Sequence, residues 1–376
     1  MMRASGRPPA SAQKAPQPSA ASPQPHDFVQ RRKRNCVLMN NGVWIPMLGL
    51  ATCQGEPSVI EKAVETAITA GYRHIDTAYN TRNEAAIGNA LRKLIASGRV
   101  KREELFIVTK LPRGGNRREK VKKCLLASLK KLQVNFVDLY LIHFPVYQGA
   151  LKTRPHPRPT KHRGGEQHHR HSLSEELDSG PTQEHKQAYQ TDILDTWKGM
   201  EDAANQGLTR SIGLCNFNRE QISRILAVAA IKPANLQVEC HAYLNQKDLQ
   251  QFCSTHSISF TAYAPLGSPA AHHASPTTSS PSGSRKHESS KLLQDSVLKA
   301  IAERHGKSPA QVLIRWLLQR GVVVLPRSTN AAHIHENFQV FDFELTEADM
   351  RLVSGLNKNI RLFTFDKPGF VSSCNV

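Results

Sequence analysis

The chain has 376 residues, which is long for one average domain but within the range of a single α/β barrel with extra segments. Its net charge of +19 raises the question of a nucleic-acid partner, but no aromatic residues alternate with the basic ones as base stacking would require, so we expect none. Seven cysteines without a C-x-x-C pair argue against a disulfide framework and a zinc site and fit a cytoplasmic location, and no apolar run is long enough to cross a membrane.

The first segment, residues 1–35, is rich in proline, alanine, serine and arginine and poor in acidic residues. This composition overlaps with that of a mitochondrial presequence, but the many prolines oppose an amphipathic helix. We therefore expect a disordered basic tail, followed by one domain over residues 36–376. That domain opens with an expected β-hairpin over residues 37–48, in which Asn41–Gly42 supplies the turn.

Short apolar segments then alternate with segments of helical periodicity. Eight strands, each followed by a helix, predict an α/β fold of the (β/α)8 TIM barrel type with an N-terminal β-hairpin. Most of the strands are apolar on both faces, as a parallel sheet covered by helices requires. The expected strands are 47–52, 73–77, 105–110, 137–143, 210–216, 235–239, 258–264 and 321–326. The expected helices are 58–70, 83–96, 117–132, 192–206, 218–229, 247–256, a pair within 294–319, and 330–337.

Two long polar loop insertions interrupt this alternation, at residues 149–190 and 268–291. Both are rich in proline, serine and histidine, and both follow expected strands. They should therefore project from the barrel end that carries an active site. The neighbouring histidines in the sequence HHRH (168–171) lack the spacing and fixed geometry of a metal site, so we expect no metal there.

Polar residues stand where the expected strands end, which is where barrels of this kind carry their chemistry. Asp76 and Lys110 end neighbouring strands and can form a buried ion pair, which can perturb the acidity of a nearby donor. His143 can donate a hydrogen bond to a carbonyl oxygen that becomes negative in the transition state. Each residue alone also has a structural explanation, but together they predict an enzyme site. The remaining strand-end residues are Cys215–Asn216, Gln237 with Glu239, Tyr263 and Arg327–Ser328.

Several motifs occur in a fixed order: GYRHIDTA, NEAAIG, FIVTKLP, VDLYLIHFP, GLCNFN, LQVECHAYL, AYAPLGS, and VVVLPRSTN followed by HENFQVFDFELT. On these motifs, the sequence resembles an NADP-dependent aldo-keto reductase of family 1 over roughly residues 36–360. The resemblance implies a barrel that binds NADPH without a Rossmann fingerprint, and no G-x-G-x-x-G occurs here. It implies hydride transfer to a small aldehyde or ketone and protonation of its oxygen. We expect the protein to be a monomer.

The resemblance also assigns roles to individual residues. It implies that Asp76, Lys110 and His143 are catalytic and that Thr81 stands at the catalytic position after the aspartate. At the nicotinamide end, it implies that Asn216 and Gln237 hold the amide and that Tyr263 stacks on the ring. It implies that Leu266 and Ser268 contact the cofactor. At the other end, it implies that Arg327, Ser328 and His333 lie at the 2′-phosphate and that Glu336 and Asn337 bind the adenine. Arg327 replaces a lysine and keeps both the charge and a fork suited to phosphate, so a preference for NADPH is retained.

One residue departs from the family pattern in a way that affects the chemistry. The family's proton donor is a tyrosine five residues after the aspartate, and this position is Thr81 here. The expected helix start at Asn83–Glu84 is in register, so no gap accounts for the difference. An aliphatic alcohol is a far weaker acid than a phenol and is too short to reach. General acid catalysis contributes about 10²–10⁴-fold in rate, or roughly 3–5 kcal/mol.

Two functional hypotheses follow for this scaffold. The first is a slow reductase in which His143 or a water held by Lys110 donates the proton, and the second is a catalytically impaired NADPH-binding protein. A nucleic-acid or structural role based on the basic surface is a third, weaker alternative. Tyr79 is either a substitute proton donor or a loop side chain that packs elsewhere. Smaller departures are Cys215 in place of a serine, and Cys53, Pro112 and Phe144 at pocket positions that are often tryptophan, which predict a less aromatic cavity.

Overall fold

The computed structural model describes residues 35–52, 55–145, 193–268 and 291–363. The predicted tail and the two predicted insertions lie outside these ranges, apart from their boundary residues. The predicted domain boundaries therefore stay predictions. Within the described ranges, no helix is long and apolar enough to cross a membrane.

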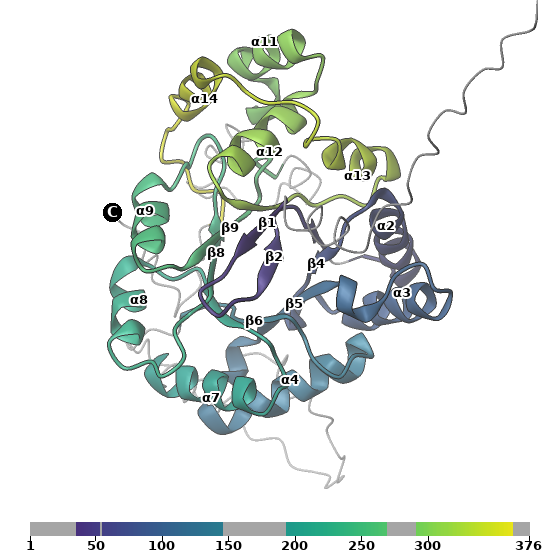
Figure 1. Cartoon of the computed structure of the whole chain (residues 1–376), viewed down its shortest axis with the longest axis vertical. Coiled ribbons are helices and arrows are strands. Elements are labelled where there is room, and N and C mark those ends of the chain that lie inside the picture. Colours follow the sequence, from purple (N-terminus) through teal and green to yellow (C-terminus); the bar gives the residue numbers. More distant parts are fainter. Residues whose placement is uncertain (1–34, 53–54, 146–192, 269–290, 364–376) are drawn as a thin grey trace, which may run out of the picture. The chain divides into compact units, whose positions relative to one another are not determined.

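Eight parallel strands form the centre of the molecule, and each pairs with the next one along the chain. The sheet closes on itself, because Leu48 and Ala51 near the first strand form parallel bridges to Val324 and Arg327 near the last. The predicted (β/α)8 barrel is thereby confirmed (Figure 1). Its strands are β3 (Leu50–Ala51), β4 (His74–Asp76), β5 (Phe106–Leu111), β6 (Leu139–Ile142), β7 (Ile212–Cys215), β8 (Asn235–Glu239), β9 (Ser259–Tyr263) and β10 (Val323–Leu325).

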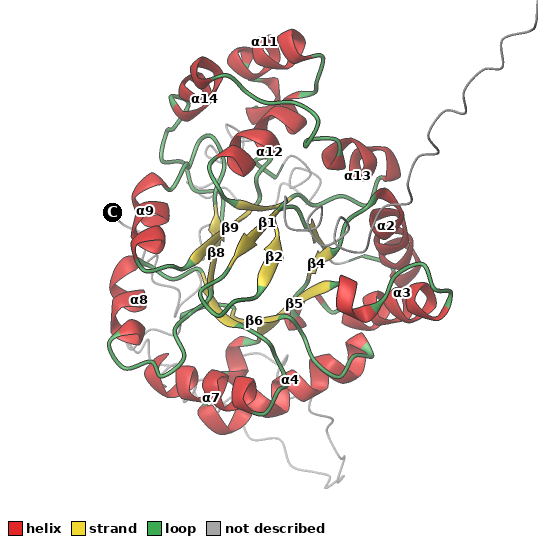
Figure 2. Cartoon of the chain, in the orientation of Figure 1, coloured by secondary structure: helices red, strands yellow, loops and turns green. Residues whose placement is uncertain are grey.

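Helices surround the strands, as Figure 2 shows. They are α2 (Pro57–Ala70), α3 (Glu84–Ala96), α4 (Arg118–Leu132), α7 (Ile193–Asn205), α8 (Arg219–Leu226), α9 (Lys247–Thr255), α11 (Ser296–His305), α12 (Pro309–Gln319), α13 (Ala331–Phe338) and α14 (Glu347–Ser354). Short 3₁₀ turns are η1 (Tyr79–Thr81), η2 (Arg102–Glu104), η3 (Arg113–Gly115) and η5 (Leu292–Gln294). Most helices agree with the predicted ranges within two residues. The exceptions are α8, which ends three residues earlier than expected, and α14, which was not expected.

The predicted hairpin is also present, as β1 (Cys36–Leu38) and β2 (Trp44–Pro46) in antiparallel pairing. Gly42 adopts φ +82°, a left-handed conformation that glycine takes without steric cost and that closes the hairpin loop. Met39 and Ile45 are buried against the inward-facing residues of the barrel, among them Phe106, Val108 and Leu141. The hairpin therefore covers one end of the barrel interior.

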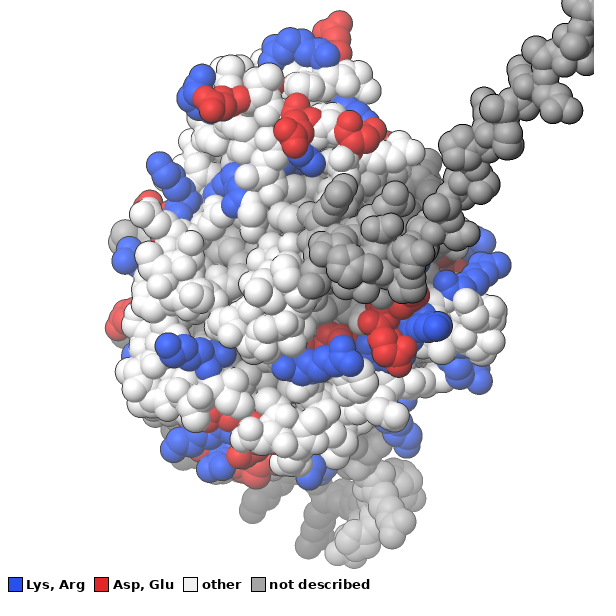
Figure 3. Space-filling model, in the orientation of Figure 1, with Lys and Arg blue, Asp and Glu red and all other residues white. Residues whose placement is uncertain are grey.

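Figure 3 shows the face of the molecule that carries this hairpin. The hairpin contains no charged residue, and around it lysines and arginines are interspersed with acidic residues. The hairpin lies at the amino ends of the strands, because Asn40 donates to Pro233 O and Asn41 donates to Ser211 Oγ, just before β8 and β7. Since the strands are parallel, their carboxyl ends lie at the opposite end of the barrel. The polar residues that end those strands therefore meet at the end that the hairpin leaves open.

Candidate active site

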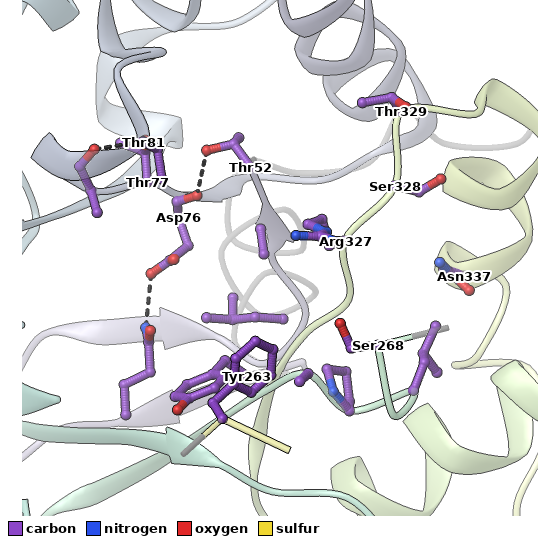
Figure 4. A pocket seen from close by; sticks show the side chains of 18 of the residues that line it. Thr52, Asp76, Thr77, Thr81, Tyr263, Ser268, Arg327, Ser328, Thr329 and Asn337 are labelled. Atoms are coloured by element: carbon purple, nitrogen blue, oxygen red, sulfur yellow. Dashed lines mark hydrogen bonds between the residues drawn. The ribbon is translucent and has the colours of Figure 1, made fainter. Parts of the chain in front are cut away.

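A cavity of about 810 Å³ lies at the carboxyl ends of the strands (Figure 4). Its volume falls within the range of roughly 300–1,000 Å³ that is usual for ligand sites in proteins. All of the residues to which the sequence analysis gave a catalytic or cofactor role line this one cavity. They are Asp76, Thr81, Lys110, His143, Asn216, Gln237, Tyr263, Leu266, Ser268, Arg327, Ser328, His333, Glu336 and Asn337.

The expected ion pair between Asp76 and Lys110 is present and buried. Lys110 Nζ lies 2.5 Å from Asp76 Oδ1 and also donates to the main-chain oxygen of Thr77 at 2.8 Å. Gln237 Nε2 donates to the other carboxylate oxygen, Asp76 Oδ2, at 2.8 Å. Buried charges are tolerated when they are paired and hydrogen-bonded in this way. The arrangement fixes the Lys110 ammonium group at the wall of the cavity.

His143 follows β6 and presents its ring to the same cavity. The ring stacks on Phe144 with 4.1 Å between the centroids. Burial, together with the positive charges of Lys110 and Arg113, holds the pKa of His143 well below its usual range, so the imidazole is neutral near pH 7. Nδ1 is enclosed and has no hydrogen-bond partner among the described residues. The ring proton is therefore better placed on Nε2, which makes Nε2 a hydrogen-bond donor.

Asn216 and Tyr263 form the next part of the wall. Asn216 has φ +65°, a left-handed conformation that asparagine adopts more readily than most residues. Its Oδ1 accepts from Tyr263 Oη at 2.8 Å, and its Nδ2 donates to the main-chain oxygen of His143 at 3.0 Å. Protein groups thus hold both ends of this amide. The bond from Gln237 to Asp76 was likewise not expected from the sequence, which placed Gln237 and Asn216 beside a nicotinamide amide.

The far end of the cavity lies between β10 and α13. Arg327 and His333 are both exposed there, so their side chains can meet a charged group that remains in contact with water. Asn330 caps α13 by accepting from the main-chain nitrogens of Ala332 and His333, at 2.8 Å and 3.3 Å. This cap fixes the start of the helix that carries Glu336 and Asn337.

Thr81 lines the cavity, but neighbouring groups already engage its hydroxyl. Oγ1 lies 2.6 Å from Ala78 O and 2.7 Å from Asn83 Oδ1, and it is 3.1 Å from Thr77 Oγ1 (Figure 4). Asn83 immediately precedes α3, so these bonds brace the start of that helix. The hydroxyl therefore supports the loop and does not stand free for chemistry.

Tyr79, two residues earlier, does not line the cavity. Its ring packs under Lys131 of α4, with Nζ 4.2 Å from the ring centroid, and 8% of the residue is exposed. Burial raises the pKa of its phenol, which makes proton donation harder. The structure therefore favours a packing role for Tyr79 over its use as a substitute donor.

Some cavity residues were not expected from the sequence. Thr52 donates through Oγ1 to the main-chain oxygen of Asp76 at 3.0 Å, and Ser308 and Phe363 come from segments distant in the chain. Ser308 carried a signal, since it precedes Pro309 and caps α12, but that signal indicates a helix start and not a cavity. Of the three positions expected to make the cavity less aromatic, Phe144 lines it, Pro112 is not among the lining residues, and Cys53 lies outside the described residues.

Comparison with known proteins assigns the chain to a family. A sequence model of the Aldo/keto reductase family matches residues 47–358, which is most of the chain. The chain belongs to the aldo/keto reductase family. Aldo-keto reductase family 1 member C1 of Macaca fuscata fuscata is 41% identical over 340 residues, which cover 89% of this chain and 95% of that protein. Aldo-keto reductase family 1 member A1 of Xenopus tropicalis is 40% identical over 321 residues, covering 85% and 88%.

Solved structures of aldo-keto reductases have the same fold. A crystal structure of a Bombyx mori aldo-keto reductase in complex with NADP has a TM-score of 0.69 and 34% identity, and the match covers 88% of this chain and 95% of that one. The aldose reductase of Schistosoma japonicum also has a TM-score of 0.69, with 40% identity and coverage of 88% and 94%. Membership of the aldo/keto reductase family supports an oxidoreductase function and, in general terms, the NADP-dependent reduction of carbonyl compounds.

Proposed function

We propose that this chain is an NADPH-dependent reductase that converts a small aldehyde or ketone into an alcohol. The observation that carries the proposal is the buried Asp76–Lys110 ion pair, which shares one cavity with the neutral ring of His143. These groups supply a fixed positive charge and a hydrogen-bond donor where a carbonyl oxygen would gain negative charge.

The residues present fit NADPH as the cofactor. The cavity is large and runs from the ion pair at β4 and β5 to the exposed Arg327 after β10. The guanidinium group of Arg327 has the planar fork that suits a phosphate, and Ser328 lies beside it. We propose that Arg327, Ser328 and His333 hold the 2′-phosphate, that Glu336 and Asn337 hold the adenine, and that Tyr263, Asn216 and Gln237 hold the nicotinamide end, with Leu266 and Ser268 between them.

In the reaction, NADPH supplies a hydride to the carbonyl carbon. Nε2 of His143 orients the substrate by donating to the carbonyl oxygen. The Lys110 ammonium group has three N–H donors, and among the described residues Asp76 and Thr77 accept two of them. The third is left for the cavity, where it can hold a water against the carbonyl oxygen as negative charge develops on that oxygen. Electrostatic stabilisation and positioning therefore remain without a tyrosine.

Protonation of the oxygen is the slow part of this scheme. The hydroxyl of Thr81 is a very weak acid and is engaged by Ala78 O and Asn83 Oδ1. The neutral ring of His143 is also a weak acid, because its lowered pKa leaves little imidazolium near pH 7. We propose that a water held by Lys110 delivers the proton and that the hydroxide left behind takes a proton from solvent. Because water is also a weak acid, this predicts a slow enzyme.

One observation favours a second candidate function, that of an NADPH-binding protein with impaired turnover. The Thr81 hydroxyl serves the start of α3, as its bonds to Ala78 O and Asn83 Oδ1 show, while the cavity around it is retained. A protein that only binds NADPH would need the cavity and not the donor. The two functions differ in turnover and agree in cofactor binding.

Turnover of the wild type separates the two, and the substitution Thr81→Tyr tests whether the rest of the site is intact. We expect it to raise the rate of NADPH oxidation with a reactive aldehyde by about 10²–10⁴-fold, because a phenol beside Lys110 restores general acid catalysis. The measurement is the steady-state loss of NADPH absorbance for the wild type and the variant. NADPH binding is measured separately, by quenching of the protein's tryptophan fluorescence.

Thr255→Tyr at the exposed end of α9 is the matched control, since it adds the same side chain far from the cavity. It should leave the rate unchanged. If NADPH binds but neither the wild type nor Thr81→Tyr turns over, the impaired binding protein is the correct description. Absence of NADPH binding would exclude both functions.

A further inference from the structure

Glu239, the last residue of β8, has no part in the reaction described above although it is fully buried near the open end of the barrel. Its carboxylate accepts hydrogen bonds from the main-chain nitrogens of Leu362, at 2.6 Å to Oε1, and Phe363, at 3.1 Å to Oε2. Both carboxylate oxygens thus hold a segment that is more than one hundred residues away in the sequence.

His241 completes the environment of this carboxylate. Its Nε2 lies 3.1 Å from Glu239 Oε1, and the ring is fully buried. Nδ1 has no partner among the described residues, so the ring proton is better placed on Nε2, where it is donated to Glu239. Two amides and one imidazole therefore satisfy a buried carboxylate, which would otherwise be costly.

The loop after β8 extends the same attachment. The main-chain oxygen of Tyr243 accepts from the nitrogens of Lys358 and Ile360, at 3.2 Å and 3.0 Å. Lys358 Nζ also lies 4.1 Å from the centroid of the Tyr243 ring, and Asn245 N donates to Asn357 Oδ1 at 3.0 Å. Residues 357–363 are thus fixed along this loop mainly through main-chain bonds, which end at Glu239.

This attachment places one side chain in the cavity. Phe363 lines the cavity, and its ring meets Tyr263 edge-on, with 5.7 Å between centroids and 70° between ring planes. Tyr263 in turn donates to Asn216, which is bonded to the main chain of His143. The segment held by Glu239 therefore forms part of the wall beside the groups proposed to act on the carbonyl.

We propose that Glu239 and His241 form a clamp, hereafter the Glu239 clamp, that positions Phe363 and so sets which carbonyl substrates fit. Glu239 is a positioning residue, because it acts through the main chain of residues 362–363. Carbonyl compounds with a bulky apolar substituent need the ring of Phe363 as a packing surface, whereas small ones do not reach it. This inference rests on the proposed reductase function, although the clamp itself can be tested without turnover.

The first test is Glu239→Gln, which keeps the size of the side chain and leaves one good acceptor oxygen for two amides. Hydrogen exchange of the Leu362 and Phe363 amides should become at least about tenfold faster, because one of the two protecting bonds is lost. The ratio of kcat/KM for 2-naphthaldehyde to that for propanal should fall about tenfold, the scale of one lost apolar contact. NADPH affinity and kcat/KM for propanal should stay unchanged.

Phe363→Ala provides a second test that does not disturb the buried carboxylate. It should lower the same ratio by a similar factor, and adding Glu239→Gln to it should lower the ratio no further. Independent, multiplying effects of the two substitutions would overturn the clamp, as would an unchanged ratio in Phe363→Ala. Glu344→Gln, at an exposed carboxylate, is the matched control and should leave the ratio and the exchange rates as in the wild type.

The readouts separate failure of the clamp from failure of the proposed function. Unchanged exchange of the Leu362 and Phe363 amides in Glu239→Gln would overturn the clamp whether or not the protein turns over. Faster exchange of these two amides in a protein without activity on any aldehyde would support the clamp and refute the reductase.

Discussion

At the scale of single residues, the buried charges of Asp76 and Lys110 matter for the local stability as well as for the chemistry proposed above. Lys110 is 4% exposed and Asp76 is 6% exposed, so water does little to solvate either group. Each charge is instead stabilised by the other and by the bonds from Gln237 and to Thr77. Removing one charge leaves the other buried without a counter-ion, which costs far more than the loss of a surface pair.

We therefore expect Asp76→Leu to lower the free energy of unfolding by about 3–5 kcal/mol, the usual cost of stranding a buried charge. Urea unfolding at pH 7 measures it. Glu347→Gln breaks the exposed pair with Arg351 and should leave the unfolding midpoint unchanged. Equal, small effects of the two substitutions would show that the Lys110 site is hydrated.

The positions of these residues could be predicted from the sequence, but their bonds could not. Asp76, Lys110 and His143 each end an apolar strand, and strand ends are visible as a change from apolar to polar residues. The bond from Gln237 to Asp76 spans 161 positions and depends on the side-chain conformations that packing selects. The same holds for the hydroxyl of Thr81. The catalytic and cofactor roles stay predictions.

At the scale of elements, α14 was missed although its first turn carries a signal. Thr346 and Asp349 form a capping box, in which each side chain accepts from the main-chain nitrogen of the other. The helix has eight residues, as α8 and α13 do, so its length alone does not explain why it was missed. Its stability comes from tertiary contacts, since Asp349 also accepts from His305 of α11 at 3.0 Å and Trp316 of α12 donates to Ser354 at 3.1 Å.

Removing the cap should therefore weaken this element measurably. We expect Thr346→Ala to lower the free energy of unfolding by about 1 kcal/mol, the typical value for a lost N-cap. Thr66→Ala is the matched control, because Thr66 lies inside α2 and its hydroxyl donates to Lys62 O in the preceding turn. There alanine should be neutral or slightly stabilising, as the better helix former. Urea unfolding of both variants compares them, and a loss of equal size in both would contradict the capping role.

At the scale of the whole molecule, the alternation of strands and helices was sufficient to predict the barrel. Its closure was less visible in the sequence. The first strand was predicted over residues 47–52 but is only Leu50–Ala51, and two isolated bridges, Leu48 to Val324 and Ala51 to Arg327, join this region to the last strand. The predicted monomeric state and cytoplasmic location stay predictions.

Global stability should fall in mild acid because of a histidine inside the barrel. Burial lowers the pKa of His74 to about 4, whereas an unfolded chain has a value of about 6.5. Below pH 6.5 His74 is protonated in the unfolded chain, whereas in the folded chain it stays neutral until the pH falls to about 4. The stability is therefore fully present above pH 6.5 and declines as the pH falls to about 4, by about 3 kcal/mol in total.

His74→Phe removes this titration while keeping a ring at the site. We expect the free energy of unfolding of the variant to change less between pH 7 and pH 5 than that of the wild type, as measured by urea unfolding at both values. The same pH dependence in both proteins would show that folding does not lower the pKa of His74.

Asp76, Lys110 and His143 lie at the ends of three different strands, which has a consequence for how such a protein can change by mutation. The main-chain ladder of the barrel fixes where each strand ends, so the backbone positions of Asp76 and Lys110 do not depend on which side chain stands at position 81. A threonine can thus occupy position 81 while the acid and the amine beside it still meet at 2.5 Å. The residue at position 81 can therefore change by a single substitution while the barrel and the Asp76–Lys110 pair are kept.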